Sequence, residues 1–173
     1  VWFRCGSVRN GARLERVSRY LDFREFEDFS AEALRANAFK VYLRFIIKHG
    51  GERHEIDLIG RRGQHMICID CKHWSHGLSF SRLSGAVERQ VERTKALGME
   101  LSRYGPRLGI GDLSDVVLVP ALVTLADTDV RAVCRVPVIP VLRLTSFLAE
   151  FDLYLDRMLV IRPELNGDPL ETR

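Results

Sequence analysis

The chain of 173 residues is predicted to form one α/β domain, in which helices pack on a mixed β-sheet. Three observations lead to this fold class. Segments with helical spacing alternate with short strand-like segments, in the order helix, three strands, helix, strand, strand, helix. Hydrophobic residues make up 46% and charged residues 28% of the chain, as in ordinary globular proteins. No linker rich in Pro, Gly or Ser divides the sequence, and its length fits a single domain.

The first half is predicted to form one helix and three strands. Apolar residues recur at helical spacing over residues 24–38. Segments rich in β-branched and aromatic residues, or with alternating polar and apolar residues, then indicate strands at 39–47, 55–59 and 65–72. Residues 60–64 between the last two are typical of a hairpin turn.

The second half is predicted to form a helix, two strands and a last helix. Residues 79–101 have one apolar side, as an amphipathic helix does. Residues 116–125 are apolar enough for a strand buried on both faces. A further strand is expected at 136–144, where two prolines favour an edge position or an irregular stretch. A capping Thr or Ser at 145 or 146 begins the last helix, which runs to residue 154.

The predicted organisation is a basic arm (1–22), the folded domain (23–160) and a C-terminal tail (161–173). No apolar run reaches the ~20 residues that span a bilayer, and the first 20 residues hold five arginines without the apolar core of a signal peptide. Four cysteines in a chain of this length do not indicate a disulfide scaffold. We therefore expect a soluble, cytoplasmic protein that does not associate with membranes.

Charge is distributed unevenly along the chain. Residues 1–111 hold 20 Lys and Arg against 13 Asp and Glu, whereas residues 112–173 hold 6 against 10. A basic surface of this kind suits a polyanion such as nucleic acid, although small domains often have uneven charge. Arginine outnumbers lysine 22 to 4, so a lysine beside acidic residues is informative.

Two carboxylates and one ammonium are predicted to meet on the second and third strands. Side chains alternate along a strand, so Glu55 and Asp57 share one face, and Asp70 and Lys72 share one face of the next strand. A hairpin that turns near Arg62 places Asp57 opposite Asp70, directly or one diagonal away. Neighbouring carboxylates repel each other and call for a cation, and hard oxygen ligands suit Mg²⁺ or Mn²⁺. Beside such a metal, a lysine can position water or stabilise negative charge.

A simpler interpretation is an Asp–Lys salt bridge on a solvated sheet face. The Asp-x-Lys spacing, the upstream Asp57, the apolar flanks and the rarity of lysine favour the metal site instead. The first helix offers a third acid. Glu27 lies at one rim of its apolar arc and Glu25 at the other, so helical geometry does not choose between them.

This order of residues resembles the PD-(D/E)xK nuclease superfamily: Glu27 on the first helix, Asp57, Asp70-x-Lys72 across a hairpin, then a helix. The branch it resembles contains archaeal Holliday-junction resolvases and restriction nucleases that act on modified DNA. The resemblance covers residues 23–100 by motif and the rest by element order. It implies a restriction-endonuclease-like fold and metal-dependent hydrolysis of DNA phosphodiester bonds. The chain departs from the family pattern at Ile56, where the motif has proline, and at Asp70, where resolvases usually have Glu.

The resemblance also implies residue roles. Asp57, Asp70 and the carbonyl of Cys71 would hold Mg²⁺ or Mn²⁺, and Lys72 would orient the attacking water. Glu27 would assist through a metal or a bound water, and we keep it as a candidate metal ligand. Cleavage of both DNA strands usually needs two sites, which points to a homodimer.

Other residues are assigned to the surroundings of the site. Glu55 is a further candidate ligand. Gln90 lies inside the apolar arc of its helix, so it either lines the site or is a core glutamine bonded to backbone. Phosphate contacts are expected from basic side chains, whose alternative is a solvated surface. These are Arg61, Arg62, His73 and Arg82, together with the arginines of residues 1–20.

Cys68 and Cys71 form a CxxC pair, which in other contexts binds zinc or carries redox chemistry. On a strand these two side chains point to opposite faces, and no second ligand pair accompanies them. We therefore expect buried cysteines that act as small apolar residues. The function predicted from sequence is a metal-dependent DNA endonuclease. The alternatives are a catalytically silent nucleic-acid-binding module of the same fold and, less favoured, a cysteine-based zinc or redox protein.

Overall fold

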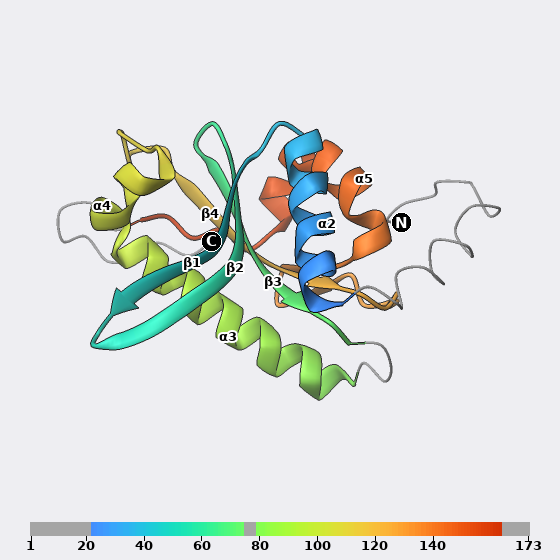
Figure 1. Cartoon of the computed structure of the whole chain (residues 1–173). Coiled ribbons are helices and arrows are strands. Elements are labelled where there is room, and N and C mark those ends of the chain that lie inside the picture. Colours follow the sequence, from blue (N-terminus) through green and yellow to red (C-terminus); the bar gives the residue numbers. More distant parts are fainter. Residues whose placement is uncertain (1–21, 75–78, 164–173) are drawn as a thin grey trace.

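The computed structural model describes residues 22–74 and 79–163, which form a six-stranded mixed sheet flanked by helices (Figure 1). The basic arm predicted at the N-terminus and most of the predicted tail lie outside the described residues. The helices are α2 (Phe23–Ala36), α3 (Phe80–Met99), α4 (Leu101–Tyr104) and α5 (Leu144–Ala149), and the 3₁₀ segments are η1 (Gly105–Leu108), η2 (Val141–Arg143) and η3 (Phe151–Arg157). The strands are β1 (Lys40–His49), β2 (Glu52–Arg62), β3 (His65–Lys72), β4 (Val117–Thr124), β5 (Ala132–Val133) and β6 (Val136–Pro140).

The predicted α/β class and element order are confirmed. The sheet order is β1-β2-β3-β4-β6-β5, with β1 to β3 antiparallel and with β3, β4 and β6 parallel. Lys72 at the end of β3 lies opposite Thr124, which in turn lies opposite Pro140. The carboxyl ends of three parallel strands therefore meet at one edge of the sheet, where α/β proteins commonly bind ligands.

Four sequence expectations differ from the structure. The strand expected at 55–59 extends over Glu52–Arg62, because the whole hairpin with β1 is paired. The strand with two prolines is not the edge strand, since the two-residue β5 pairs outside it. The last helix ends at Ala149 and continues as 3₁₀ turns. Ile161, placed in the tail by the sequence, is buried and bridged to Leu118.

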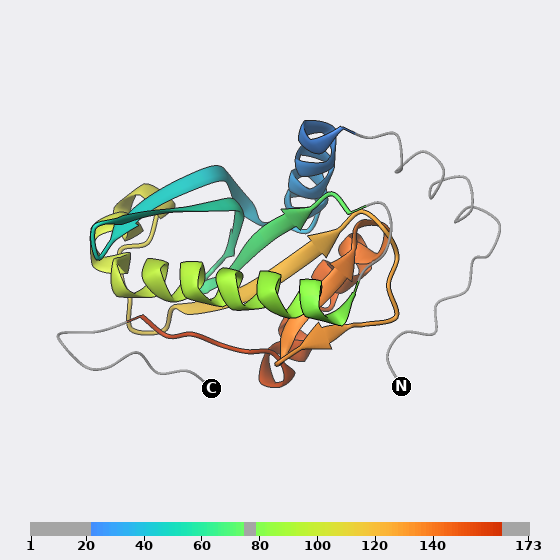
Figure 2. The same cartoon turned by 90° about the horizontal axis from the view of Figure 1, so that it is seen from below.

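The sheet separates two hydrophobic layers (Figures 1 and 2). One face packs against α2 and α5 through residues such as Phe26, Leu34 and Phe147. The other face packs against α3 through two clusters that include Leu97 and Leu83. No helix among the described residues is long and apolar enough to cross a membrane.

The β1–β2 hairpin is distorted at Arg44, and this changes the faces of nearby side chains. Arg44 has a φ of 48°, while the pairs on either side of it, Leu43–Leu58 and Phe45–Ile56, stay in register. Ile56 packs in the layer under α3, but Leu58 packs in the layer under α2. The strict alternation of side chains expected along this strand is therefore wrong here, because it is interrupted at Asp57.

Candidate functional site

Asp57 of β2 is tied to the backbone of β3 between two of the predicted site residues. The paired part of the β2–β3 ladder ends at Leu58 and Ile69, one position before Asp57 and Asp70. Asp57 Oδ2 accepts a hydrogen bond of 2.8 Å from the backbone N–H of Cys71. Cys71 stands between Asp70 and Lys72, so the hairpin register predicted from the sequence brings the three groups to one end of the ladder.

Asp70 is buried, with 2% of its surface exposed, and each of its oxygens is held by a cation. Lys72 Nζ lies 2.6 Å from Oδ2, and Arg93 Nη1 of α3 donates to Oδ1 over 2.9 Å. Arg93 is not among the site residues predicted from the sequence. The one clue to it is its position: Arg93 follows Gln90 by three residues and so lies on the same side of the helix.

Asp57 differs from Asp70 in its electrostatic environment. Burial raises the pKa of the Asp57 carboxyl to about 6, and the negative charges of Asp70 and Glu27 act in the same direction. The hydrogen bond from Cys71 N–H and the charge of Lys72 oppose this rise. Within the described residues Asp57 has no ion pair with a cationic side chain. Added positive charge would therefore stabilise its ionised form.

The structure brings Glu27, not Glu25, toward Asp57. Glu27 of α2 is buried and accepts from Arg44 Nη2 (2.8 Å) and Nε (3.2 Å). Glu25 forms the capping box of α2, in which its side chain accepts from Asp22 N–H and the Asp22 side chain accepts from Glu25 N–H. A capping box points its acid back along the helix end. The capping interaction therefore decides which of the two acids is free to face Asp57, a choice that helical spacing alone does not make.

The donors at this end of the ladder are carboxylate and carbonyl oxygens, which fit Mg²⁺ or Mn²⁺ in chemistry. Asp57 supplies a partly buried carboxylate that has no ion pair with a cationic side chain among the described residues, and Asp70 and the Cys71 carbonyl are its neighbours on β3. Across residues 22–74 and 79–163, no three His, Cys, Asp or Glu side chains gather closely enough to form a complete metal-binding group. Arg93 and Lys72 instead hold the oxygens of Asp70.

Gln90 and the cysteines lie in the packed interior. Gln90 Nε2 donates to the Cys68 carbonyl over 2.8 Å, as expected for a core glutamine that supports β3. Its Oε1 is buried without a hydrogen-bond partner in the described part of the chain. Cys68 and Cys71 pack in different layers and are free thiols, as the strand alternation predicted. Burial raises the pKa of Cys68 to about 12 and that of Cys71 well above its ordinary value, so neither is a ready thiolate.

The remaining predicted residues contact groups other than Asp57 and Asp70 in the described part of the structure. Glu55 pairs with Arg53 over 3.2 Å. The guanidinium of Arg82 lies over the ring of Trp74. His73 is exposed and makes an edge contact with Phe26.

The two arginines of the hairpin turn have different surroundings. Arg62 donates to the carbonyl of Asn37 and pairs with Asp152, so its guanidinium is held within the protein. Arg61 lies across the ladder from Lys40, and both side chains reach the loop at Gly109. The Nε of Arg61 has no hydrogen-bond partner in the part of the chain that the structure describes.

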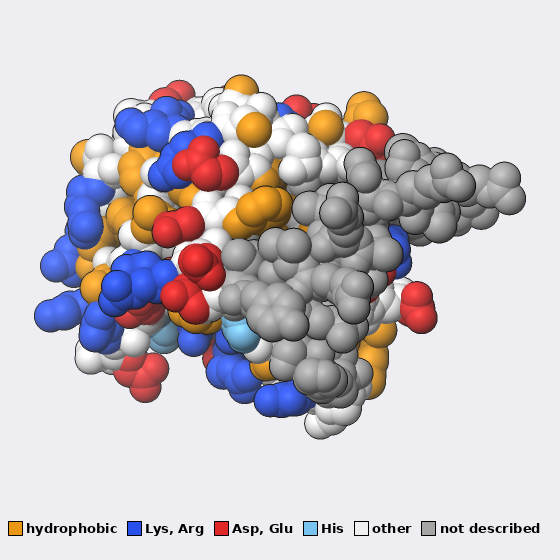
Figure 3. Space-filling model, turned by 45° about the vertical axis from the view of Figure 1, so that its right-hand side comes forward, with side chains coloured by type: hydrophobic (Ala, Val, Ile, Leu, Met, Phe, Trp, Pro, Cys, Tyr) orange, Lys and Arg blue, Asp and Glu red, His pale blue; other side chains and the backbone are white. Residues whose placement is uncertain are grey.

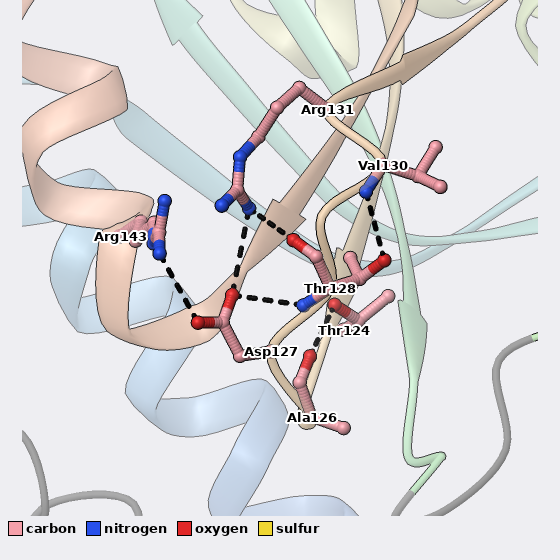
Figure 4. A network of polar contacts seen from close by, with 7 residues as sticks. All are labelled: Thr124, Ala126, Asp127, Thr128, Val130, Arg131 and Arg143. Atoms are coloured by element: carbon pink, nitrogen blue, oxygen red, sulfur yellow. Dashed lines mark hydrogen bonds and ion pairs between the residues drawn. The ribbon is translucent and has the colours of Figure 1, made fainter. Parts of the chain in front are cut away.

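The loop after β4 is ordered beside Lys72 by a network around Asp127 (Figure 4). Asp127 pairs with Arg143 over 3.2 Å and with Arg131 over 3.5 Å, and it accepts from the backbone N–H of Thr128. Leu125 N–H donates to the Lys72 carbonyl, which joins this loop to β3. The network therefore braces the sheet edge where β3 ends.

Charged side chains of both signs gather on one face of the molecule. Figure 3 shows Lys and Arg side chains along one side and the lower part of the view, next to acidic side chains nearer its middle. Basic and acidic side chains therefore lie next to one another on this face.

Comparisons with known proteins do not place the chain in a family. No family model matches it, and no curated protein matches it. Among solved structures it is similar to the crystal structure of AF1548, a protein of unknown function, with a TM-score of 0.37 and 16% sequence identity. The similarity covers 57% of this chain and spans 46% of AF1548.

Proposed function

We propose that this protein is a metal-dependent DNA endonuclease with a restriction-endonuclease-like fold. The observation that carries the proposal is the hydrogen bond from Cys71 N–H to Asp57, which fixes one carboxylate between Asp70 and Lys72. Glu27 acts on the same carboxylate from α2. The order of these residues in the chain is the one that resembles the PD-(D/E)xK nucleases.

The oxygens of Asp57, Asp70 and the Cys71 carbonyl would hold Mg²⁺ or Mn²⁺. When bound, such a metal supplies a Lewis acid and an activated water for phosphodiester hydrolysis. Burial keeps the Asp57 carboxyl protonated up to about pH 6, so its ionisation accompanies cation binding. The ammonium of Lys72 orients the attacking water and stabilises the charge that develops on the phosphate.

The DNA backbone would be held by basic side chains that lie outside the carboxylate cluster. Lys40 and Arg61 together form a pair of cations that reach the Gly109 loop, and Arg82 lies near the start of α3. Such contacts position a duplex without reading its sequence. Two copies of the chain would supply the two sites needed to cut both strands.

Substitutions at Lys72 and Asp70 test the proposal. Lys72→Ala removes the charge beside the water, and Asp70→Asn removes one metal ligand charge. We expect each to lower Mg²⁺-dependent cleavage by ~10²-fold or more, while DNA affinity persists because it depends on arginine–phosphate contacts. The measurement is a cleavage panel of labelled linear, nicked, branched and single-stranded DNA, with binding measured separately in EDTA. Lys48→Ala, an exposed lysine of β1, is the matched control. If Lys72→Ala cuts as well as the parent, the lysine is structural and the mechanism is wrong.

A DNA-binding module without turnover is the second candidate, and one observation favours it. Both oxygens of Asp70 are neutralised by cations of the chain itself, Lys72 and Arg93. An aspartate held in this way can be purely structural. Binding of DNA by the unmutated protein, without cleavage of any substrate in the panel with Mg²⁺ or Mn²⁺, would decide for this candidate.

A further inference from the structure

Asp70 has more positive charge around it than one carboxylate needs. Lys72 and Arg93 both pair with it, whereas Glu27 is matched by Arg44 alone. These three groups alone sum to about +1, and the Asp57 carboxylate beside them balances that charge when it is ionised. A metal that engaged both carboxylates would leave Lys72 and Arg93 without their acidic partner, and such cations favour an anion nearby.

A divalent cation that binds Asp70 competes electrostatically with these two side chains, because each holds one carboxylate oxygen at 2.6 or 2.9 Å. Lys72 lies two residues away on the same strand, which keeps its ammonium beside Asp70. Arg93 comes from α3, and its side chain is 29% exposed. This long side chain is partly exposed, so the guanidinium can turn toward solvent.

The released guanidinium has a chemically matched partner in DNA. Its planar set of donors fits two phosphate oxygens at once, which an ammonium does not match. A bound divalent cation would also repel Arg93 from Asp70 and draw a phosphate to the same place.

We propose that Arg93 binds the DNA phosphate at the cleavage site and that, in the DNA-free protein, it occupies Asp70 and weakens metal binding there. This inference rests on the proposed function. Arg93 thus exchanges a carboxylate for a phosphate as metal and DNA bind. It predicts opposite effects of one substitution on metal affinity and on cleavage.

The test uses Arg93→Gln, which removes the charge and keeps most of the side-chain volume. Without DNA, we expect it to bind Mn²⁺ at least ~3-fold more tightly than the parent by calorimetry, because a competing cation has gone. With DNA, we expect cleavage to fall ~10–100-fold, because a charge-assisted contact to phosphate is lost. Arg93→Lys keeps a charge near Asp70 without the planar fork, so its Mn²⁺ affinity should stay near the parent value while cleavage falls.

Arg89→Ala is the matched control, since Arg89 is an exposed arginine one turn earlier on α3. It should match the parent in both measurements. The inference is overturned if Arg93→Gln equals the Arg89→Ala control in both, or if metal affinity and cleavage fall together with the melting temperature, which is the result of a merely structural ion pair. Failure of the proposed function is seen in a different sample: the parent protein then neither binds Mn²⁺ at Asp70 nor cleaves DNA.

Discussion

The Asp57 carboxyl is partly buried and forms no ion pair with a cationic side chain of the described structure. One hydrogen bond from Cys71 N–H offsets only part of the cost of burying its charge, so the carboxyl has a pKa of about 6. An unpaired buried carboxylate lowers stability when it ionises, and proteins keep such groups mainly where they serve a site. Whether ionisation of Asp57 raises or lowers the stability of the protein can be measured.

Asp57→Asn is expected to stabilise the metal-free protein at pH 8. The folded-state pKa is raised above the ordinary value of 3.8, so the stability that Asp57 contributes is present below about pH 4 and lost as pH rises through 6. The variant cannot ionise and escapes this loss, which has an upper limit of ~3 kcal/mol. Melting temperatures in EDTA should exceed those of the parent at pH 8, and the difference should shrink as pH falls and vanish below about pH 4. Asp115→Asn, at an exposed position, should show no such pH dependence. A constant difference between Asp57→Asn and parent across this range would contradict the account.

At the same scale, the sequence predicted the residues of the β2–β3 hairpin better than their partners from elsewhere. A short turn sets the register of a hairpin, so the proximity of Asp57 to the Asp70-x-Lys72 strand followed from spacing. Arg44 and Arg93 reach the site through long side chains whose direction depends on the packed structure. Their roles could not be predicted from the spacing of residues in the chain.

Helix α2, which carries Glu27, is held against β2 by a close approach at Gly60. A Cβ at this position would lie 2.7 Å from Leu34 Cδ2, 3.1 Å from Ile67 Cγ2 and 3.2 Å from Phe39 Cδ1. Leu34 is fully buried, so it has little room to move. The sequence predicts Gly60 only as the start of a turn. Its close packing against α2 depends on how the helix and the sheet pack together.

Gly60→Ala is therefore expected to destabilise the protein by ~1–3 kcal/mol through overpacking under α2. It should also lower cleavage, because a shift of α2 moves Glu27. Gly85→Ala on α3 is the control with the opposite sign: its Cβ meets only Arg89 Nη1 at 3.5 Å, so the helix should gain ~0.5–1 kcal/mol. Urea denaturation measures both. Equal stability of parent and Gly60→Ala would show that Leu34 and its neighbours repack freely.

Strand elements also show where periodicity stops being informative. β3 and β4 were predicted to within a residue at each end, because turn residues precede each strand and β4 is a continuous apolar segment. The distortion at Arg44 interrupts the alternation without altering the register, and no glycine marks it in the sequence. The two-residue β5 is a strand because it pairs with β6, and its own sequence has no strand pattern.

For the whole molecule, the candidate site lies where separately packed layers come together. α2 packs in one hydrophobic layer and α3 in the other, with the sheet between them (Figure 2). The charge of Glu27 on α2 acts on Asp57 of the sheet, and Arg93 on α3 pairs with Asp70. The α/β class and the order of elements followed from sequence periodicity. That one side chain from α2 and one from α3 reach the same end of the β2–β3 ladder is a tertiary property, which no local pattern encodes.

A cation bound between these layers should stabilise the whole domain. Binding to the folded state alone adds RT ln(1 + [L]/Kd), which is ~2.7 kcal/mol at a hundredfold excess over Kd. We expect millimolar Mg²⁺ or Mn²⁺ to raise the melting temperature of the parent at pH 8 and EDTA to reverse the rise. Lys48→Ala should respond as the parent does, and Asp70→Asn should not respond.

Asp57→Asn gives the sharpest form of this prediction, because metal and proton act on the same carboxylate. In EDTA at pH 8 this variant should melt above the parent, since it lacks the buried charge. In Mg²⁺ the difference in melting temperature between the two proteins should shrink or change sign. Only the parent is stabilised by the cation that its ionised carboxylate holds. A site that serves only to pack the sheet would instead give the same difference between the two proteins with and without metal.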